Sequence, residues 1–382
     1  MKNICIVGVG ETKPTRVSDK PIDALVLEAI SIALEDAGIS PNEVDGVVSD
    51  SVYGPRAIGL DKVAAHLGNP GMWSAGRSAG GAGIMSAPAL AAEAIDSGKA
   101  NVVVFYFAMD GGSRKGGPYS NHNRYAAKPY FEKPYGFTGQ PVYFATWARR
   151  YFEAFKGAEQ ALAIISISAS QNAAATGRAQ RPKALSEDDY WNAPMIADPL
   201  RLRDCCVISD GAGAYVMTSR ARAKDCRKLP VEVLAASLAQ PAMSGESAFT
   251  QFGDLLVLPG AEEASKLAFA SAGITHADLS FAQIYDCFTI SCLLQLEDLG
   301  FCGKGEGPAF VSNGRISLSG RMPINTHGGL LAYSYLLGVE HVIEAVRQLR
   351  GEAGAVQLSN PRIGLVSGLS MPDYGVMLLA AQ

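Results

Sequence analysis

The side chains that most often do chemistry in enzymes are scattered in this sequence rather than grouped. The 382 residues include seven cysteines and five histidines, and no two cysteines stand in a CxxC pair. An odd number of thiols without such a pair is typical of buried, unreactive cysteines rather than of a zinc site or a disulfide framework. We therefore expect no metal site and no disulfide among Cys5, Cys205, Cys206, Cys226, Cys287, Cys292 and Cys302.

Two glycine pairs mark the other places where chemistry could be located. The pair at 80–81 opens the small-residue stretch GGAGIMSAPALAAEAIDSG, and the pair at 328–329 follows Asn325 and His327. Glycine lets the backbone approach a ligand closely, but it is also the residue that tight turns require. Both interpretations stay open at this point.

Composition argues against several classes of function. The net charge is −4 and the isoelectric point is near 5.8, with Lys and Arg dispersed along the chain, so we expect no nucleic-acid partner. The first residues lack the apolar core of a signal peptide, and no apolar run approaches the ~20 residues that cross a bilayer. We expect a cytoplasmic protein that does not bind membranes.

The elements that must position these residues occur twice along the chain. A helix predicted over 23–37 ends at Gly38, and one predicted over 262–272 ends at Gly273, because glycine is the usual helix C-cap. ALEDAGISPNEVD near the first glycine aligns with AFASAGITHADLS near the second. We predict two similar halves, 1–228 and 229–382, with helices alternating with strands of parallel sheets.

The first half carries an insertion, about 110–157, that has no counterpart in the second half. The stretch is rich in Phe, Tyr and Trp, and its glycines and prolines forbid one long helix. One interpretation is a flap that folds on its own aromatic side chains. The other is a cover for an apolar ligand or a surface for a partner, centred on Tyr125 to Phe155, and the two interpretations are compatible.

Several stretches in fixed order resemble the thiolase superfamily, in its branch of lipid-transfer or sterol-carrier-type thiolases. They are GGAGIMSAPALAAEAIDSGKANVVV, ADPLRLRDCCVISDGAGAYV, YDCFTI and NTHGGLLAYSYLLG, and together they span most of the chain. The resemblance implies an α/β fold, a five-layer α-β-α-β-α sandwich of two pseudo-symmetric halves with an inserted loop domain. It also implies a homodimer.

The sequence departs from the thiolase pattern at each catalytic position. Gly81 stands where thiolases hold the nucleophilic cysteine, whose pKa the start of a helix depresses. Tyr335 replaces the histidine that activates this cysteine, and VSGLS at 366–370 lacks the second cysteine. Tyr285 is the first residue of YDCF, where related proteins have NEAF or HDCF. Covalent acyl transfer is therefore not expected.

Two tyrosines at these positions resemble a subgroup of thiolase-like aldolases. Members of that subgroup shorten steroid side chains by retro-aldol cleavage of a β-hydroxyacyl-CoA, in complex with a small OB-fold and zinc-ribbon protein. A phenol has an unperturbed pKa near ~10 and can serve as acid or base when its neighbours tune it. The resemblance implies that Tyr285 and Tyr335 are catalytic, and we favour Tyr335 as the base because it replaces the histidine.

The remaining candidates would support these two phenols. The cleavage needs a cradle for the enolate that forms on the thioester, and backbone amides around Gly81 and Gly368 are candidates for it. Asp286 either orients Tyr285 or caps a turn. His327 and Asn325 either contact the thioester or Tyr335, or stabilise their own turn.

The expected small-molecule partner is the acyl-CoA substrate. The expected protein partners are a second copy of the chain and the accessory protein, and the two kinds of chain form a heterotetramer. No bound cofactor is expected, since the substrate arrives as a coenzyme A thioester. One alternative is an acyltransferase or thiolase with an unrecognised nucleophile, such as Ser78 or Cys287. Another is a carrier of lipid or acyl-CoA, or a scaffold subunit, without catalysis.

Overall fold

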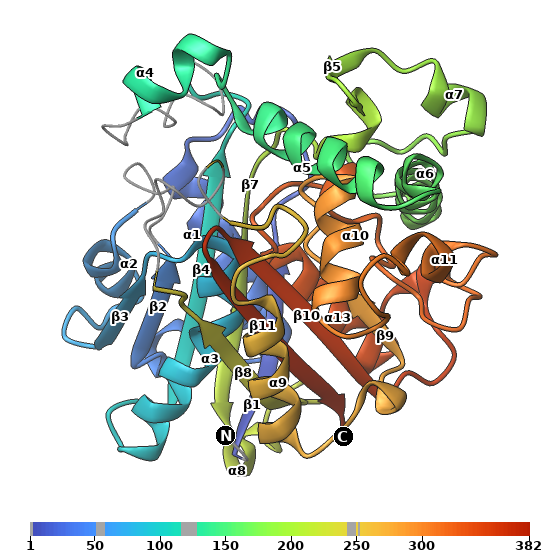
Figure 1. The fold of residues 1–382 in the computed structure, drawn as a ribbon. Coiled ribbons are helices and arrows are strands. Elements are labelled where there is room, and N and C mark those ends of the chain that lie inside the picture. The colour runs from blue at the N-terminus through green and yellow to red at the C-terminus, as the bar shows by residue number, and fades with distance from the viewer. Residues whose placement is uncertain (1–2, 51–57, 116–127, 243–249, 251–252) are drawn as a thin grey trace.

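A computed structural model of the chain describes residues 3–50, 58–115, 128–242, 250 and 253–382. The described residues form one nine-stranded sheet in the order β3-β2-β4-β7-β1-β8-β11-β10-β9 (Figure 1). Its strands are β1 (Ile4–Glu11), β2 (Gly46–Asp50), β3 (Trp73–Arg77), β4 (Val102–Asp110), β7 (Asp210–Ser219), β8 (Val231–Ala239), β9 (Phe281–Gln283), β10 (Ile363–Ser370) and β11 (Asp373–Ala381). A separate ribbon pairs β5 (Met195–Ala197) with β6 (Leu200–Arg201).

The sheet divides into two sides, each built from one continuous part of the chain. The five strands that precede residue 220 lie on one side, and β8 to β11 lie on the other. The two sides meet where β1 pairs with β8, with Cys5 opposite Glu232 and Ile6 opposite Val231. The boundary at 228/229, and the superposition of one half on the other, stay predictions.

The repeated helix ends found in the sequence are present in the structure. Helix α1 (Ile22–Ala37) ends at Gly38 with φ 70°, and α9 (Ala261–Ala272) ends at Gly273 with φ 69°, so both glycines are left-handed C-caps. A short 3₁₀ turn follows each, at Pro41–Glu43 and at His276–Asp278, and leads into β2 or β9. The two segments therefore have the same order of elements.

The expectation of parallel sheets is wrong for most of the strand pairs. Strand β2 is parallel to β3 and β4, and β9 is parallel to β10. All the pairs that β1, β7, β8 and β11 make are antiparallel. At β10 and β11 the reason is local, because only two residues separate the strands and so short a turn can join antiparallel neighbours only.

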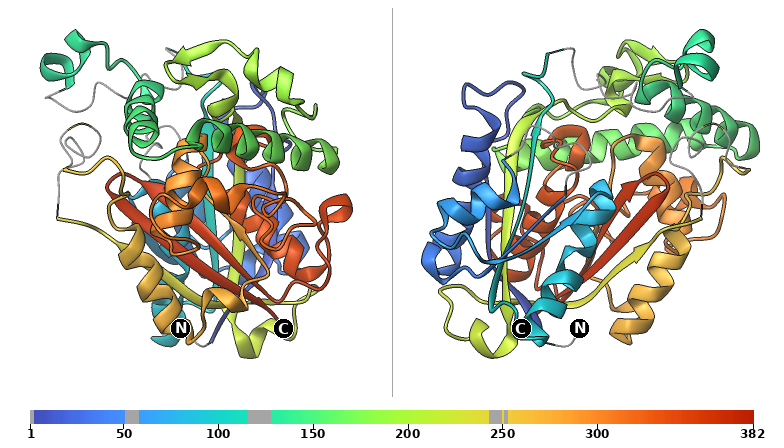
Figure 2. Two further views of the ribbon diagram at one scale, coloured as in Figure 1. Left: turned by 45° about the vertical axis from the view of Figure 1, so that its right-hand side comes forward. Right: turned by 90° about the vertical axis from the view of Figure 1, so that its left-hand side faces the viewer.

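Helices arranged around the sheet give five layers, as Figure 2 shows in its right-hand view. Helix α1 covers the outside of β1, β4 and β7, and α9 covers the outside of β8 and β11. Helix α3 (Gly80–Asp96) lies between the two sides and packs on strands of both, as does α13 (Val339–Arg350). The expected five-layer sandwich is confirmed, with α3 and α13 as its central layer.

The described part of the insertion packs onto the second half. In α5 (Gln140–Ala154) one face is buried, and Phe144 stacks on Phe288 with ring centroids 4.3 Å apart. Nearer its start, Tyr130, Phe131 and Tyr135 expose 76%, 70% and 79% of their surface. Helix α5 thus packs on the second half and not only on aromatic side chains of the insertion, whereas these three rings face solvent. The flap and cover interpretations stay predictions. Tyr125 lies outside the described residues.

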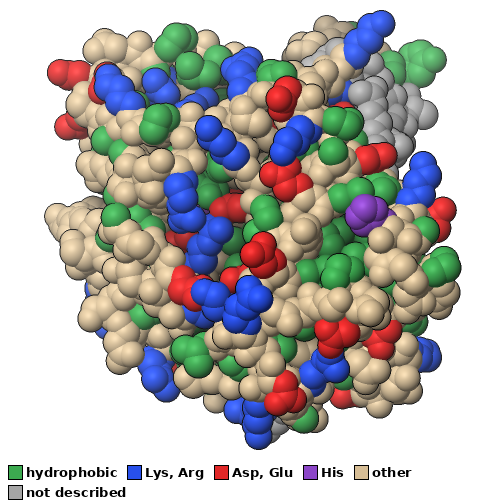
Figure 3. Space-filling model, turned by 180° about the vertical axis from the view of Figure 1, so that it is seen from behind, with side chains coloured by type: hydrophobic (Ala, Val, Ile, Leu, Met, Phe, Trp, Pro, Cys, Tyr) green, Lys and Arg blue, Asp and Glu red, His purple; other side chains and the backbone are tan. Residues whose placement is uncertain are grey.

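The other described helices connect these layers. They are α2 (Leu60–His66), α4 (Lys128–Phe131), α6 (Ala158–Thr176), α7 (Glu187–Trp191), α8 (Arg220–Ala223), α10 (Thr289–Asp298), α11 (Gly307–Val311) and α12 (Gly329–Ala332), with 3₁₀ turns at Lys133–Tyr135, Leu202–Asp204 and Gly354–Val356. Among the described residues, none of the helices has the length and apolar character that spanning a bilayer would require. Figure 3 shows Lys and Arg intermixed with Asp and Glu over the face turned away from the view of Figure 1.

The packing of α1 on β1 generates a test of stability. A Cβ added at Gly8 of β1 would lie 2.1 Å from the carbonyl oxygen of Ala33 in α1. Gly8→Ala should therefore force the helix away and destabilise the protein by about 1–3 kcal/mol, measured by denaturant unfolding. Gly71→Ala is the control, because a Cβ there meets nothing within 4 Å. Equal stability of the two variants would contradict the close packing.

Candidate active site

The hydroxyl groups of Tyr285 and Tyr335 lie 3.1 Å apart, at hydrogen-bonding distance. Their rings meet edge to face, with centroids 6.5 Å apart. Tyr285 follows β9 and is buried, whereas Tyr335 lies between α12 and α13 and is half-buried. The structure therefore brings together the two sequence-predicted catalytic residues, and a proton can pass directly between their oxygen atoms.

A buried side-chain amide, that of Gln295, helps to hold both backbone groups of Tyr285. The amide nitrogen of Gln295 in α10 donates to the carbonyl oxygen of Tyr285 at 2.6 Å. Its oxygen accepts from the hydroxyls of Ser367 at 2.8 Å and Tyr374 at 2.7 Å, and Ser367 Oγ also accepts from the backbone N–H of Tyr285 at 3.0 Å. Sequence reasoning missed Gln295 and Ser367. The available signal was a glutamine within the apolar stretch SCLLQL.

Tyr335 is held by a second chain of hydrogen bonds. Its backbone N–H donates to Ser209 Oγ at 2.9 Å, and this hydroxyl donates to Oε1 of Gln180 at 2.7 Å. The amide nitrogen of Gln180 in turn donates to the carbonyl oxygen of Ile208 at 2.8 Å. The loop before β7 and the segment after α6 therefore fix the position of Tyr335.

Gly81 leaves room for the ring of Tyr285. A Cβ added at Gly81 would lie 2.9 Å from Cε2 of Tyr285 and 2.9 Å from the carbonyl oxygen of Leu369. Real Cβ atoms do not approach other atoms this closely, so any side chain at position 81 would displace the tyrosine or strand β10. A Cβ at Gly368 would meet the carbonyl oxygen of Gly81 at 2.1 Å. Gly81 and Gly368 thus allow the backbones of α3 and β10 to lie close together, and their role in binding an enolate stays a prediction.

Asp286 caps the start of α12. It is completely buried, and Oδ1 accepts from the backbone N–H of Leu330 at 2.7 Å and lies 3.4 Å from Nε2 of His341. A Cβ at Gly329 would lie 2.1 Å from Oδ2, so the glycine is required for the carboxylate to fit. The turn-capping alternative therefore describes these contacts. Because α12 ends shortly before Tyr335, Asp286 also influences the position of Tyr335.

Asn325 uses both ends of its side chain on the residue before Tyr285. Its Oδ1 accepts from the N–H of Ile284 at 2.7 Å, and its Nδ2 donates to the carbonyl oxygen of Ile284 at 2.9 Å. The side chain thus replaces a neighbouring strand at the end of β9. Asn325 positions Tyr285 through the backbone, and a direct contact with substrate stays a prediction.

His327 is a buried, neutral histidine. Its ring packs against Tyr333 and His341, with centroids 4.8 and 5.2 Å away. Burial, and secondarily the neighbouring His341, lower the pKa of His327 well below 6.5. Its ring nitrogens make no hydrogen bond within the described residues, so a hydrogen bond to Tyr335 is not seen there, and a contact with the thioester stays a prediction.

The two alternative nucleophiles lack the activation that covalent catalysis needs. Burial raises the pKa of the Cys287 thiol to about 12, which leaves almost no thiolate near neutral pH. Ser78 is exposed in the turn before α3, and no hydrogen bond to a basic group is described for it. Neither residue has the arrangement of an acyl carrier.

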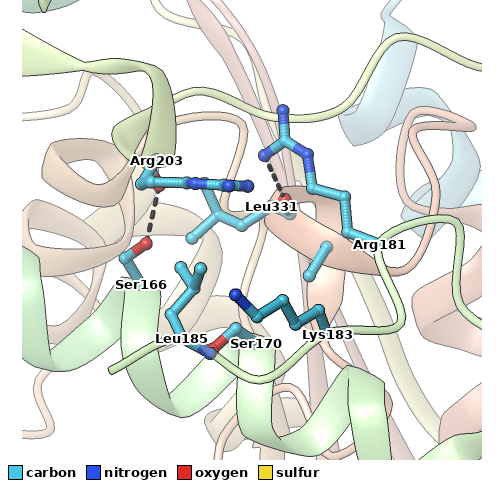
Figure 4. Close-up of a pocket in the computed structure, with 8 residues that line it drawn as sticks. Ser166, Ser170, Arg181, Lys183, Leu185, Arg203 and Leu331 are labelled. Carbon is cyan, nitrogen blue, oxygen red and sulfur yellow. Dashed lines mark hydrogen bonds between the residues drawn. The ribbon is translucent and has the colours of Figure 1, made fainter. Parts of the chain in front are cut away.

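A hollow behind α12 gathers three basic side chains, Arg181, Lys183 and Arg203 (Figure 4). It is barely large enough for one water molecule. Arg181 donates to the carbonyl oxygen of Leu331 at 3.0 Å, and burial, aided by nearby Arg203, lowers its pKa. Its backbone N–H donates to Ala332 at 3.0 Å. These hydrogen bonds from Arg181 therefore hold α12, the helix that precedes Tyr335.

Comparison with known proteins finds relatives that are similar along the whole chain. The sequence is 35% identical over 382 residues to the 17-hydroxy-3-oxo-4-pregnene-20-carboxyl-CoA lyase of Mycobacterium tuberculosis, covering 98% of each chain. It is 30% identical over 392 residues to the steroid side-chain-cleaving aldolase of Thermomonospora curvata, covering 98% of this chain and 97% of that protein. Residues 241–377 match the family described as thiolase C-terminal domain-like.

Among solved structures, the fold is similar to that of the Ltp2-ChsH2(DUF35) aldolase. The TM-score is 0.91 at 29% sequence identity, and the match covers 100% of this chain and 98% of that chain.

The contact between Gly81 and Tyr285 can be tested by a double substitution. Gly81→Ala should lower turnover of a β-hydroxyacyl-CoA by about 10- to 100-fold, because a reacting group displaced by ~1 Å loses activity on that order. Gly76→Ala is the control, since its Cβ would meet only Leu60 Cδ1, at 3.9 Å. In a Tyr285→Ala background the loss of thermal stability caused by Gly81→Ala should shrink. An equal loss in both backgrounds would contradict the contact.

Proposed function

The chain belongs to the thiolase superfamily, in the thiolase-like branch that contains steroid side-chain-cleaving aldolases, and on this basis we propose its substrate and catalytic residues. It is a carbon–carbon lyase that performs retro-aldol cleavage of a coenzyme A thioester. The substrate we propose is a β-hydroxyacyl-CoA with a steroid or another bulky apolar acyl chain. The observation that carries the proposal is the pair of tyrosine hydroxyls 3.1 Å apart, beside a position that cannot hold a nucleophile.

Tyr335, as phenolate, takes the proton from the β-hydroxyl group of the substrate. The oxygen then forms a carbonyl, the bond between Cα and Cβ breaks, and its electron pair becomes the enolate of the thioester. Tyr285 donates a proton to Cα, which gives the shortened acyl-CoA and a free carbonyl product. Because the two hydroxyls are hydrogen-bonded, the proton taken by Tyr335 can then pass to Tyr285. This transfer restores the phenolate of Tyr335 and the neutral phenol of Tyr285.

The enolate needs hydrogen-bond donors placed where its negative charge develops. We propose that backbone amides at the start of α3 and at Gly368-Leu369 supply these donors, because the nitrogen of Leu369 would lie 3.0 Å from a Cβ on Gly81. Preorganised donors of this kind contribute roughly 10²- to 10³-fold to turnover. The thioester itself withdraws electrons, so the proposed cleavage requires no bound cofactor.

A small partner protein completes the proposal. The similar solved structure is an aldolase described with a DUF35 component, and we propose that this chain forms a comparable heterotetramer built on a homodimer. The exposed rings of Tyr130, Phe131 and Tyr135 are the surface that we propose for this partner. Exposed aromatic rings at a protruding helix are typical of protein interfaces.

Replacing either catalytic phenol by a phenylalanine tests the chemistry. Tyr285→Phe and Tyr335→Phe keep the ring but remove the group that transfers the proton, so kcat should fall by ~10²- to 10⁴-fold with little change in binding. The control is Tyr333→Phe, which removes another buried hydroxyl, one that donates to Glu11 at 2.6 Å. Wild-type turnover in both site variants would contradict the catalytic role of the two phenols, whereas wild-type protein without any turnover would favour a carrier.

Co-expression with a DUF35-type protein tests the partner. The two chains should co-purify as a complex, and Phe131→Ser should weaken it, because an apolar ring leaves the proposed contact. Leu267→Ser on α9, whose side chain is also exposed (49%), is the control for a change of surface polarity. A fully active chain whose mass and turnover do not respond to the partner would contradict the proposal.

A further inference from the structure

One turn, residues 335–338, contains one candidate catalytic tyrosine and packs against the other. Tyr335 is its first residue, and at its other end a Cβ added at Gly338 would lie 3.4 Å from Cδ2 of Tyr285. The backbone of the turn therefore packs against the ring of one tyrosine and carries the other. Any change in the shape of the turn alters the position of one phenol relative to the other.

The 335–338 turn has an unfavourable backbone conformation. Leu337 has φ 60° and Gly338 has φ 98°. The left-handed region is accessible to glycine, but in a leucine the Cβ crowds the following carbonyl group. A leucine keeps such a conformation only where surrounding contacts stabilise it.

The contacts that stabilise this turn come from Glu340. The residue is 1% exposed, with Oε1 accepting from the N–H of Leu336 at 2.7 Å and Oε2 from the N–H of Gly338 at 3.0 Å. The two donors flank Leu337, so one side chain bridges the strained residue. Burial is the largest influence on Glu340 and raises its pKa to about 8, while the two amides act in the opposite direction.

We propose that Glu340 is a positioning residue for the tyrosine pair. By accepting from both amides, it fixes the 335–338 turn and so sets the distance between the hydroxyls of Tyr335 and Tyr285. The inference rests on the proposed retro-aldol function, because the role given to Glu340 is to keep the base and the acid at the correct distance from each other. Glu340 itself does not touch the reacting atoms.

Glu340→Gln is the substitution that tests this role. Glutamine has the same size but offers one acceptor oxygen, and its NH₂ group would face an N–H of the turn. The turn should relax, and kcat should fall by about 10-fold or more while KM changes less than about 3-fold, since small displacements affect the reaction more than binding. Glu340→Asp keeps both oxygen atoms on a shorter stem and should give a partial loss.

The matched control is Glu344→Gln, one helical turn further along α13. Glu344 is also buried, but its Oε1 accepts from Thr326 Oγ1 at 2.7 Å and Gln348 Nε2 at 2.9 Å, away from the 335–338 turn. Glu344→Gln should lower the thermal midpoint while leaving kcat within about 2-fold of the wild-type value, because no reacting group moves. Wild-type kcat in Glu340→Gln, or an equal fall in both variants, would overturn the inference.

A crystal structure of Glu340→Gln separates this inference from the proposed function. We expect a distance between the two hydroxyls clearly longer than the 3.1 Å of the wild type. An unchanged distance would overturn the positioning role even if turnover falls. If the wild-type protein cleaves no β-hydroxyacyl-CoA, the proposed function fails, while the measured distance still decides the structural claim.

Discussion

The start of helix α3 and strand β10 lie so close together that neither can carry a side chain where they cross. A Cβ on Gly368 would lie 2.1 Å from the carbonyl oxygen of Gly81, and a Cβ on Gly81 would lie 2.9 Å from the ring of Tyr285. The central helix of one half, a strand of the other and a catalytic candidate thus share one contact. The absence of a nucleophile and the presence of the tyrosine follow from the same constraint, because both would need the same space.

Around this contact, side chains replace the backbone pairing that strands normally provide. Asn325 pairs with both backbone groups of Ile284, and Gln295 holds the carbonyl of Tyr285 together with Ser367. A buried backbone group left without a partner costs roughly 1–3 kcal/mol, so such networks are either complete or destabilising. At the end of β9 the backbone N–H and C=O groups of Ile284 and Tyr285 all have side-chain partners, and these bonds hold Tyr285 in place.

Charged side chains connect the central layer to the rest of the fold. Arg347 of α13 pairs with Glu11 of β1, which also accepts from the hydroxyl of Tyr333, and Arg350 pairs with Asp36 of α1 at 2.7 Å. Buried pairs of this kind add little net stability, but removing one partner leaves an uncompensated charge. They therefore fix the orientation of α13, the helix that carries Glu340 and follows Tyr335.

The sequence by itself determined the repeated helix ends at Gly38 and Gly273, because helix caps are local properties of the chain. The layered α/β class and the choice of Tyr285 and Tyr335 came from motifs that resemble the thiolase superfamily. The sequence did not determine the antiparallel pairs, since strand direction depends on where distant segments return. Nor did it separate Asn325, Asp286 and His327 as positioning, capping and packed residues. Those roles depend on distant partners, such as Leu330 and His341 for Asp286, and only tertiary packing brings such partners together.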